Sequence, residues 1–256
     1  TGALVEFTGT FNIHLRYLSY TVVDDHTIVG TAKGHGVYGI PPHTSLRVVI
    51  KTSNKVERGN LSVNGHTMWN IGTSFIDTDS AYQNIPTETF DNLLEKNNQI
   101  WNKALGKIVI EESDEKKIRK FYTILYRTLL FPMSLKEPSG KHYSPYSVNG
   151  KIFEGELSTG SGFWDVYRTV YPFLHLVYPE QASRILNGWV NSIKESPDNM
   201  LAEWASPGKI NVMEGAMGEI SIAEGILNDA IDDVDTAWEY LYRSCLTPAG
   251  RESFEI

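Results

Sequence analysis

The residues best suited to chemistry lie in one short segment, residues 162–172, which reads GFWDVYRTVYP. Within it, Trp164, Asp165 and Arg168 place a ring, a carboxylate and a guanidinium in five positions. In a helix, Trp164 and Arg168 would share a face, with Asp165 beside it. This arrangement suits a monosaccharide, because the ring covers the apolar face of the sugar while the charged groups bind hydroxyls. The structural alternative is a helix start at which Asp165 pairs with Arg168, and spacing alone favours neither interpretation.

A second segment, residues 199–208, again places a carboxylate beside a ring, at Glu203 and Trp204. It leads to residues 213–219, which read MEGAMGE, and the whole stretch lies between two predicted helices. Three uses are open to the Glu203 carboxylate: it binds hydroxyls, serves as a general acid, or caps a nearby helix.

The elements that position these segments fall into two parts. Residues 1–90 are predicted to be β, from alternation such as Val5 and Phe7, a β-branched run at residues 46–51 and a hairpin signal at Asn64-Gly65. Short strands at this spacing predict a β-sandwich. Five histidines in this part have no metal-ligand spacing and are interpreted as surface or strand residues: His14, His26, His35, His43 and His66.

From residue 87 onward the apolar period becomes helical. It predicts helices over residues 90–107, 114–130, 178–196, 219–230 and 233–246. Residues 134–162 are predicted to be a long loop rich in Gly, Ser, Pro and Tyr, which is unusual in a compact domain unless the loop carries function. Cys245, the only cysteine, lies in the apolar pattern of the last helix, so it is predicted to be a buried structural thiol.

Composition excludes several classes of protein. The chain has 256 residues, of which 41% are hydrophobic and 21% charged, as expected for one or two globular domains. A net charge of −8 argues against a nucleic-acid or anionic-membrane binder. No apolar run approaches the ~20 residues of a membrane span. The 13 Tyr and 6 Trp are many for this length, and such rings often line sugar-binding clefts.

Several strings together resemble the family 92 glycoside hydrolases, which are calcium-dependent, exo-acting α-mannosidases. They are WNKALGKI at residues 101–108, FYTILY at 121–126, HYSPY at 142–146, the segment 162–172, YPE at 178–180, and residues 204–215. Their order and spacing match the family over about residues 93–256, and the GFWDxYRTVYP string is quite specific.

The resemblance implies a β-sandwich portion followed by an α-helical (α/α)6-toroid-type domain that is incomplete in this chain. On that basis residues 1–90 are the distal part of the sandwich, 91–113 a helical linker, and 114–256 the first part of the catalytic toroid. It also implies removal of terminal α-linked mannose from mannan or N-glycan oligosaccharides by an inverting, calcium-assisted mechanism, and a periplasmic or extracellular location. Carried over by position, Trp164, Asp165 and Arg168 belong to the mannose-binding wall, with Glu203 and Trp204 beside it.

The sequence departs from the family in two places. Met217 and Gly218 replace a polar His and Ser in the loop near the sugar. The Tyr-x-Glu-Gly-Asn string of the catalytic acid and the Gly-Asn-Asp-Asp-x-Gly-Gln-like string of the base are absent, so both groups, with most calcium ligands, are expected beyond Ile256. No catalytic or metal-binding residue is therefore assigned within the chain. We expect weak sugar binding and no hydrolysis unless a second chain or a C-terminal segment completes the toroid.

Three other interpretations remain open. One is a compact glycosidase of another kind, with Asp165 and Glu203 as its acid and base. Another is a non-catalytic carbohydrate-binding protein that uses Trp164 and Trp204 as stacking platforms. The third is a purely structural or interaction protein, in which the aromatic residues form the core.

Overall fold

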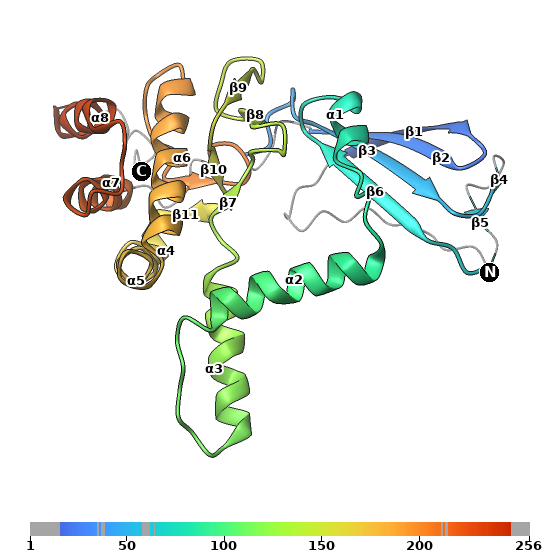
Figure 1. Cartoon of the computed structure of the whole chain (residues 1–256). Coiled ribbons are helices and arrows are strands. Elements are labelled where there is room, and N and C mark those ends of the chain that lie inside the picture. The colour runs from blue at the N-terminus through green and yellow to red at the C-terminus, as the bar shows by residue number, and fades with distance from the viewer. Residues whose placement is uncertain are drawn as a thin grey trace.

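The structure is a computed structural model that describes residues 16–34, 36, 39–57, 62–63, 65–210, 212 and 215–246. Figure 1 shows a sheet near the N-terminus and a body of helices near the C-terminus, with α2 and α3 extending between and below them. Among the described helices, none has the length and apolar character needed to cross a membrane. The chain therefore combines a sheet with helices, and the candidate site is on the helical side.

Four antiparallel strands form the main sheet in the order β1-β2-β3-β6. They are β1 Arg16–Asp24, β2 Thr27–Lys33, β3 Ser45–Thr52 and β6 Trp69–Ser74, while β4 Val56–Glu57 and β5 Ser62–Val63 form a separate hairpin. Ile28 lies opposite Ile50 and is buried with Val48, since alternate side chains share one face of a sheet. The predicted run at residues 46–51 lies within β3, and the β-sandwich itself stays a prediction.

The predicted β range contains a short helix that sequence analysis missed, α1 Thr78–Gln83. It begins at Asp77, whose carboxylate accepts a hydrogen bond from the Ser80 amide at 2.7 Å. The helix lies directly against β6 at Gly72, where a Cβ atom would come 2.0 Å from the Ala81 carbonyl oxygen. Other predictions fall outside the described residues, namely those for Val5, Phe7, His14, His35 and Asn64.

Helices α2 Phe90–Leu105 and α3 Glu115–Thr128 confirm two predicted helices to within two residues at each end. The Thr89 hydroxyl accepts from the Asn92 amide at 3.3 Å, and the Asp114 carboxylate accepts from the Lys116 amide at 2.9 Å. Such caps satisfy amide groups that have no partner inside the helix.

The predicted loop over residues 134–162 is not irregular, and this expectation was wrong. It contains β7 Met133–Ser134 paired with β10 Ser158–Thr159, and β8 Lys141–Tyr143 paired with β9 Ile152–Glu154. Strands of two or three residues are too short to show an alternating pattern, so the Gly and Pro residues of their turns dominated the sequence. We call residues 133–162 the hairpin lobe.

The helical body comprises α4 Phe163–Val166, α5 Val170–Val177, α6 Pro179–Glu195, α7 Met217–Leu227 and α8 Val234–Leu246. Helix α6 lies at its centre and buries Leu186, Trp189 and Ile193 almost completely. Pro179 is its first residue, because the missing amide hydrogen of proline costs nothing there. The predicted helices at 178–196, 219–230 and 233–246 correspond to α6, α7 and α8.

Only part of the apolar pattern of α8 faces inward. Ala237 and Tyr240 are buried, whereas Trp238 is 65% and Tyr242 59% exposed. Cys245 is exposed, so the prediction of a buried thiol was wrong. Five residues beyond Tyr240 correspond to a rotation of about 140° around the helix, which directs Cys245 away from the core.

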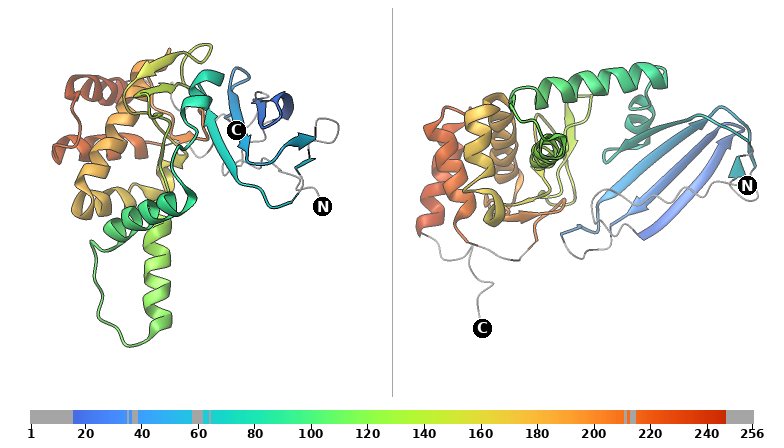
Figure 2. Two further views of the ribbon diagram at one scale, coloured as in Figure 1. Left: turned by 45° about the vertical axis from the view of Figure 1, so that its right-hand side comes forward. Right: turned by 90° about the horizontal axis from the view of Figure 1, so that it is seen from below.

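The sheet meets the hairpin lobe through buried polar contacts. The Thr44 hydroxyl lies 2.7 Å from the Tyr143 hydroxyl. The Glu137 carboxylate accepts hydrogen bonds from the Ser74 hydroxyl and from the Phe75 amide. Figure 2 shows the sheet beside the helical body, with α2 spanning the distance between them. These contacts fix the sheet against the part of the chain that carries the candidate site.

Candidate functional site

The candidate site is built on α4, where Phe163 faces inward and Trp164 outward. Phe163 is fully buried. Its ring is stacked on the Tyr171 ring, with 5.6 Å between ring centres, and is tilted against the Trp189 ring, with 5.1 Å between ring centres. The Trp189 indole donates a hydrogen bond to the Tyr171 hydroxyl at 2.8 Å. Trp164, the next residue, is 50% exposed. A rigid aromatic core thus presents an indole ring to solvent.

Asp165 and Arg168 are also exposed. The helix ends at Val166, so the continuous helical face proposed for Trp164 and Arg168 does not form. The Arg168 guanidinium instead lies over the Tyr167 ring, 5.1 Å from its centre. Within the described part of the chain, Asp165 neither caps α4 nor forms an ion pair with Arg168. The structural alternative for these two residues, a capping pair, is therefore not observed.

Glu203 has a different environment, because only 9% of it is exposed. The amide of Gly218, in the first turn of α7, donates to both carboxylate oxygens at 3.1 Å. The N-cap residue of α7, Ala216, has no side chain that accepts a hydrogen bond from the amides of the first turn. A carboxylate there is favoured by the free amides and by the helix dipole. The helix-capping use left open by the sequence is the one observed, and contact of Glu203 with a sugar stays a prediction.

The Glu203 carboxylate also affects the pKa of two buried phenols. Burial raises the pKa of the Tyr171 hydroxyl, and the nearby Glu203 carboxylate raises it further. Burial likewise raises the pKa of Tyr240 well above its usual value, with added effects from Glu219 and Glu203. Both hydroxyls therefore stay protonated at any ordinary pH.

Trp204, the residue after Glu203, begins a short strand, β12 Trp204–Ala205. This strand pairs with β11 Ser161–Gly162, and Gly162 is the direct partner of Trp204. A Cβ atom on Gly162 would lie 1.9 Å from Cε2 of the Trp204 indole. The ring therefore occupies the space that any other side chain at position 162 would need.

The structure thus brings Trp204 next to the start of α4, while the buried Glu203 carboxylate is held by the first turn of α7. Sequence analysis treated Gly218 only as a departure from the family and Gly162 only as the start of its segment, and it missed that these two glycines accommodate the Glu203 and Trp204 side chains. The signal was present but weak: one glycine precedes the Phe-Trp pair, and the other lies in the first turn of a helix. The neighbouring Met213 and Glu214 are outside the described residues, and Met217 opens α7.

No metal site is found where the structure is described: no three or more His, Cys, Asp or Glu side chains group to hold an ion. A calcium ion held by a cluster of such side chains is therefore not offered by the described residues. Two of the histidines predicted to be surface or strand residues are described as follows. Nδ1 of His26 lies 3.1 Å from the carbonyl oxygen of Thr52, the last residue of β3, and His66 is exposed. His43 is half-buried and packs against the Tyr143 ring.

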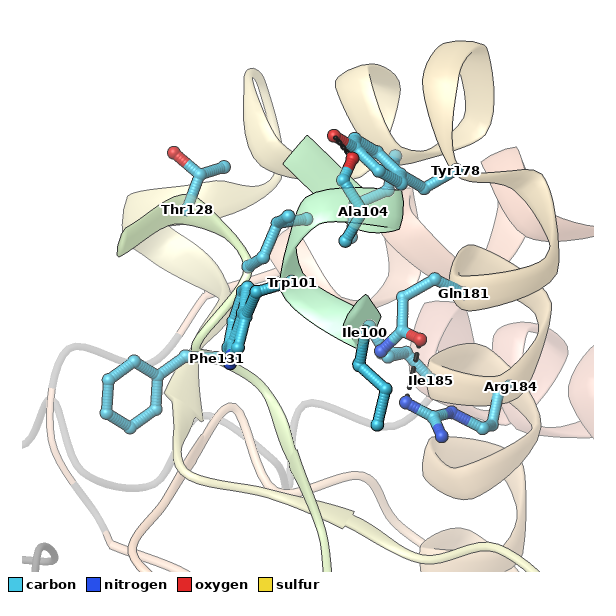
Figure 3. A pocket seen from close by; sticks show the side chains of 11 residues that line it. Ile100, Trp101, Ala104, Thr128, Phe131, Tyr178, Gln181, Arg184 and Ile185 are labelled. Atoms are coloured by element: carbon cyan, nitrogen blue, oxygen red, sulfur yellow. Dashed lines mark hydrogen bonds between the residues drawn. The ribbon is translucent and has the colours of Figure 1, made fainter. Parts of the chain in front are cut away.

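Two cavities lie elsewhere, between the α2–α3 pair and the helical body. One, of about 230 Å³, includes Trp101, Phe131 and Tyr178, with Gln181 and Arg184 at one side (Figure 3). The other, of about 370 Å³, is lined by α3 and the start of α5. Both are mainly apolar, and neither is lined by a predicted site residue. They are therefore not part of the candidate sugar site.

A protein-family model described as the glycosyl hydrolase family 92 catalytic domain matches residues 78–253. Among solved structures, a family GH92 inverting mannosidase from Bacteroides thetaiotaomicron VPI-5482 is similar, with a TM-score of 0.75 and 25% sequence identity over 90% of this chain and 35% of that chain. No curated protein matches the sequence.

A family GH92 α-mannosidase from Bacteroides thetaiotaomicron has a TM-score of 0.73 and 21% identity, over 88% of this chain and 35% of that one. Its complex with mannoimidazole gives the same TM-score and identity, with 34% of that chain covered. At this identity the likeness concerns the fold alone. The chain spans about a third of the length of these solved structures.

Proposed function

The chain belongs to glycosyl hydrolase family 92, and from this premise we propose that it forms part of an enzyme that removes terminal α-linked mannose from mannan or N-glycan oligosaccharides. The family match covers residues 78–253, and a solved structure 25% identical to the chain is described as an inverting mannosidase. The mannoimidazole complex of a second relative supports a mannoside as the ligand class.

One observation carries the proposal: Trp164, Asp165 and Arg168 are exposed within five residues of one another. They directly follow Phe163, which belongs to a fully buried aromatic core. The Trp164 ring offers an apolar surface for the C–H face of a pyranose. The Asp165 carboxylate accepts hydrogen bonds from hydroxyls, and the Arg168 guanidinium donates them. Asp165 has no partner among the described residues, so binding a sugar breaks no ion pair or helix cap of that residue.

For the chemical step we propose inversion, in which an acid protonates the leaving oxygen and a base activates water across the ring. The two carboxyl groups of such an enzyme lie ~6.5–9.5 Å apart to admit the water. Since neither of the family's acid and base strings occurs in these 256 residues, we propose that both groups are supplied from outside them. The role of this chain is then to bind and orient the mannosyl unit.

The remaining parts of the proposal follow from the family. Helices α5 to α8 would belong to an (α/α)6 toroid, and the sheet to a β-sandwich; the TM-score of 0.75 to a family member supports both assignments. Calcium assistance and a periplasmic or extracellular location are proposed on the family alone. Calcium ligands are expected outside the described residues.

The test is a pair of measurements on the purified chain: mannose release from an α-linked mannobiose, with calcium and with a chelator, and binding of mannoimidazole by calorimetry. We expect no release, and saturable binding that Trp164→Ala abolishes. Trp238→Ala is the matched control, because Trp238 is a comparably exposed indole at 65% on α8, far along the chain from the site.

Each result decides between interpretations. Calcium-dependent release by this chain alone would contradict the assignment of acid and base to other residues, and would favour Asp165 and Glu203 as a catalytic pair. Binding lost equally in both tryptophan variants, or unchanged in both, would exclude the Trp164 wall. A longer protein that contains this chain and binds mannosides without turnover would favour the non-catalytic alternative, with Trp164 and Trp204 as platforms.

A further inference from the structure

Two consecutive residues of the candidate site, Glu203 and Trp204, contact two different elements of the fold. Glu203 reaches the first turn of α7, and Trp204 lies over β11. At each contact the partner is a glycine, Gly218 for the carboxylate and Gly162 for the indole. Each of these two side chains therefore packs against a glycine, in space that a larger residue at that position would occupy.

The space at Gly218 is filled by the carboxylate. A Cβ atom there would lie 2.5 Å from Oε1 of Glu203 and 2.6 Å from Cδ2 of Leu201. Gly218 has helical backbone geometry within α7, which any residue adopts. The requirement for glycine is consequently one of space alone, and an added methyl group would have to displace the ends of two flexible side chains.

Glu203 also connects α7 to the start of α4 through its backbone. Its carbonyl oxygen accepts the Phe163 amide at 3.0 Å, next to Trp164 in the chain. The carbonyl oxygen of Trp204 accepts the Ile210 amide at 2.8 Å. A shift of the Glu203 side chain therefore acts on β12, and through β12 on both the Trp204 ring and the beginning of α4.

We propose that Gly218 is a positioning residue of the candidate site. By leaving room for the Glu203 carboxylate on α7, it holds β12 against β11 and keeps the Trp204 indole on Gly162. Glu203 then serves the site by fixing the strand that carries Trp204, and not by touching the sugar. The part of this inference that concerns mannosides rests on the proposed function, whereas the placement of Trp204 does not.

The experiment is a double-mutant cycle on Gly218→Ala and Glu203→Asp. The readout is the near-ultraviolet circular dichroism of Trp204, isolated by subtracting the spectrum of Trp204→Phe. We expect Gly218→Ala to lose this signal. Glu203→Asp shortens the side chain by one methylene and thereby makes room for the new methyl group, so the double variant should recover most of the signal. Ile220→Ala, at an exposed position of the same helix, is the control and should leave the signal unchanged.

A second pair of variants keeps the test decisive if Gly218→Ala does not fold. Glu203→Gln retains an oxygen that accepts the Gly218 amide and should keep the Trp204 signal, whereas Glu203→Ala should lose it. Loss of the signal in Glu203→Gln, or its persistence in Gly218→Ala, would overturn the proposal. So would an effect of Ile220→Ala equal to that of Gly218→Ala.

Mannoimidazole binding is then measured on the same proteins. Gly218→Ala should bind at least about tenfold more weakly, with recovery in the double variant, because a small displacement of a binding group has a large effect on affinity. Additive losses in the cycle would mean that Glu203 contacts the ligand directly, against the proposal. If no variant binds, including the unmodified chain, the proposed function fails while the spectral result still decides the role of Gly218.

Discussion

His142 and Glu195 form a buried hydrogen-bonded pair, with Nε2 of the imidazole 2.9 Å from Oε1 of the carboxylate. The other ring nitrogen, Nδ1, lies 2.9 Å from the carbonyl oxygen of Gly155, which only accepts hydrogen bonds. Nδ1 therefore faces a backbone acceptor, and Nε2 faces the carboxylate. The pair joins the hairpin lobe to the end of α6, with both side chains almost wholly buried.

Removal of one partner should be costly. His142→Phe leaves the Glu195 carboxylate buried without its partner, and we expect a loss of about 3–5 kcal/mol in the free energy of unfolding. Glu195→Gln should have a much smaller effect, since an amide still bonds to the imidazole. Urea unfolding at neutral pH measures both variants. A loss below about 1 kcal/mol for His142→Phe would show that the pair is not a stabilising contact.

Gly162→Ala should displace the Trp204 ring. The backbone of Gly162 is extended, with φ −115°, so alanine fits its conformation and only the 1.9 Å approach to the indole opposes it. We expect a loss of about 1–3 kcal/mol from overpacking, together with loss of the Trp204 near-ultraviolet signal. Gly140→Ala is the control, because a Cβ there meets nothing within 4 Å and its cost is backbone strain at φ +84°. An unchanged Trp204 signal in Gly162→Ala would contradict the prediction.

Glu137→Ala should weaken the junction between the sheet and the hairpin lobe. The carboxylate accepts from the Ser74 hydroxyl, the Phe75 amide and the Asn84 side chain. Loss of these acceptors should cost about 1–3 kcal/mol and increase amide hydrogen exchange at Phe75. Lys136→Ala is the neighbouring control; it removes a partly exposed ion pair with Glu156 and should cost less than about 1 kcal/mol. Equal losses in the two variants would exclude a special role for Glu137.

His175 makes stability depend on pH. Burial lowers the pKa of its imidazole, and Glu224 opposes part of that effect. The unfolded chain therefore binds a proton more readily than the folded one, so this contribution to stability is present at neutral pH and is lost as the pH falls below about 6.5.

Urea midpoints measured between about pH 7.5 and pH 5.5 test this prediction. His175→Gln should lose less stability over that range than the unmodified chain, whereas His66→Gln, at an exposed loop position, should follow the unmodified chain. Identical pH profiles for His175→Gln and the unmodified chain would contradict it.

The helices were predictable because their signals are local. Thr89, Asp114 and Pro179 mark helix starts in the sequence and begin α2, α3 and α6 in the structure. The inward face of α8 was not predictable, because Trp238 and Tyr242 are as apolar as Ala237 and Tyr240. Only the tertiary contacts with α6 and α7 select between the two faces. The strands of the hairpin lobe were missed for another reason: with two or three residues each, they are too short to show an alternating pattern.

The candidate site was predicted in composition but not in arrangement. The outward position of Trp164 followed from its segment, and Phe163 beside it supplies the core. Glu203 and Trp204 were interpreted as one unit because they are adjacent in the sequence. Their separate contacts depend on Gly218 for Glu203 and on Gly162 for Trp204, and neither glycine is adjacent to the pair in the sequence.

The buried contact between Thr44 and Tyr143 joins residues that are 99 positions apart. A ribosome adds about 5–20 residues per second, so the strands that precede Thr44 emerge roughly 5–20 s before Tyr143 is made. During that interval the sheet has its own strand partners but not the surface on which it rests in the finished protein. A chaperone that shields the Thr44 end of the sheet would act in this interval, before the hairpin lobe exists to cover it.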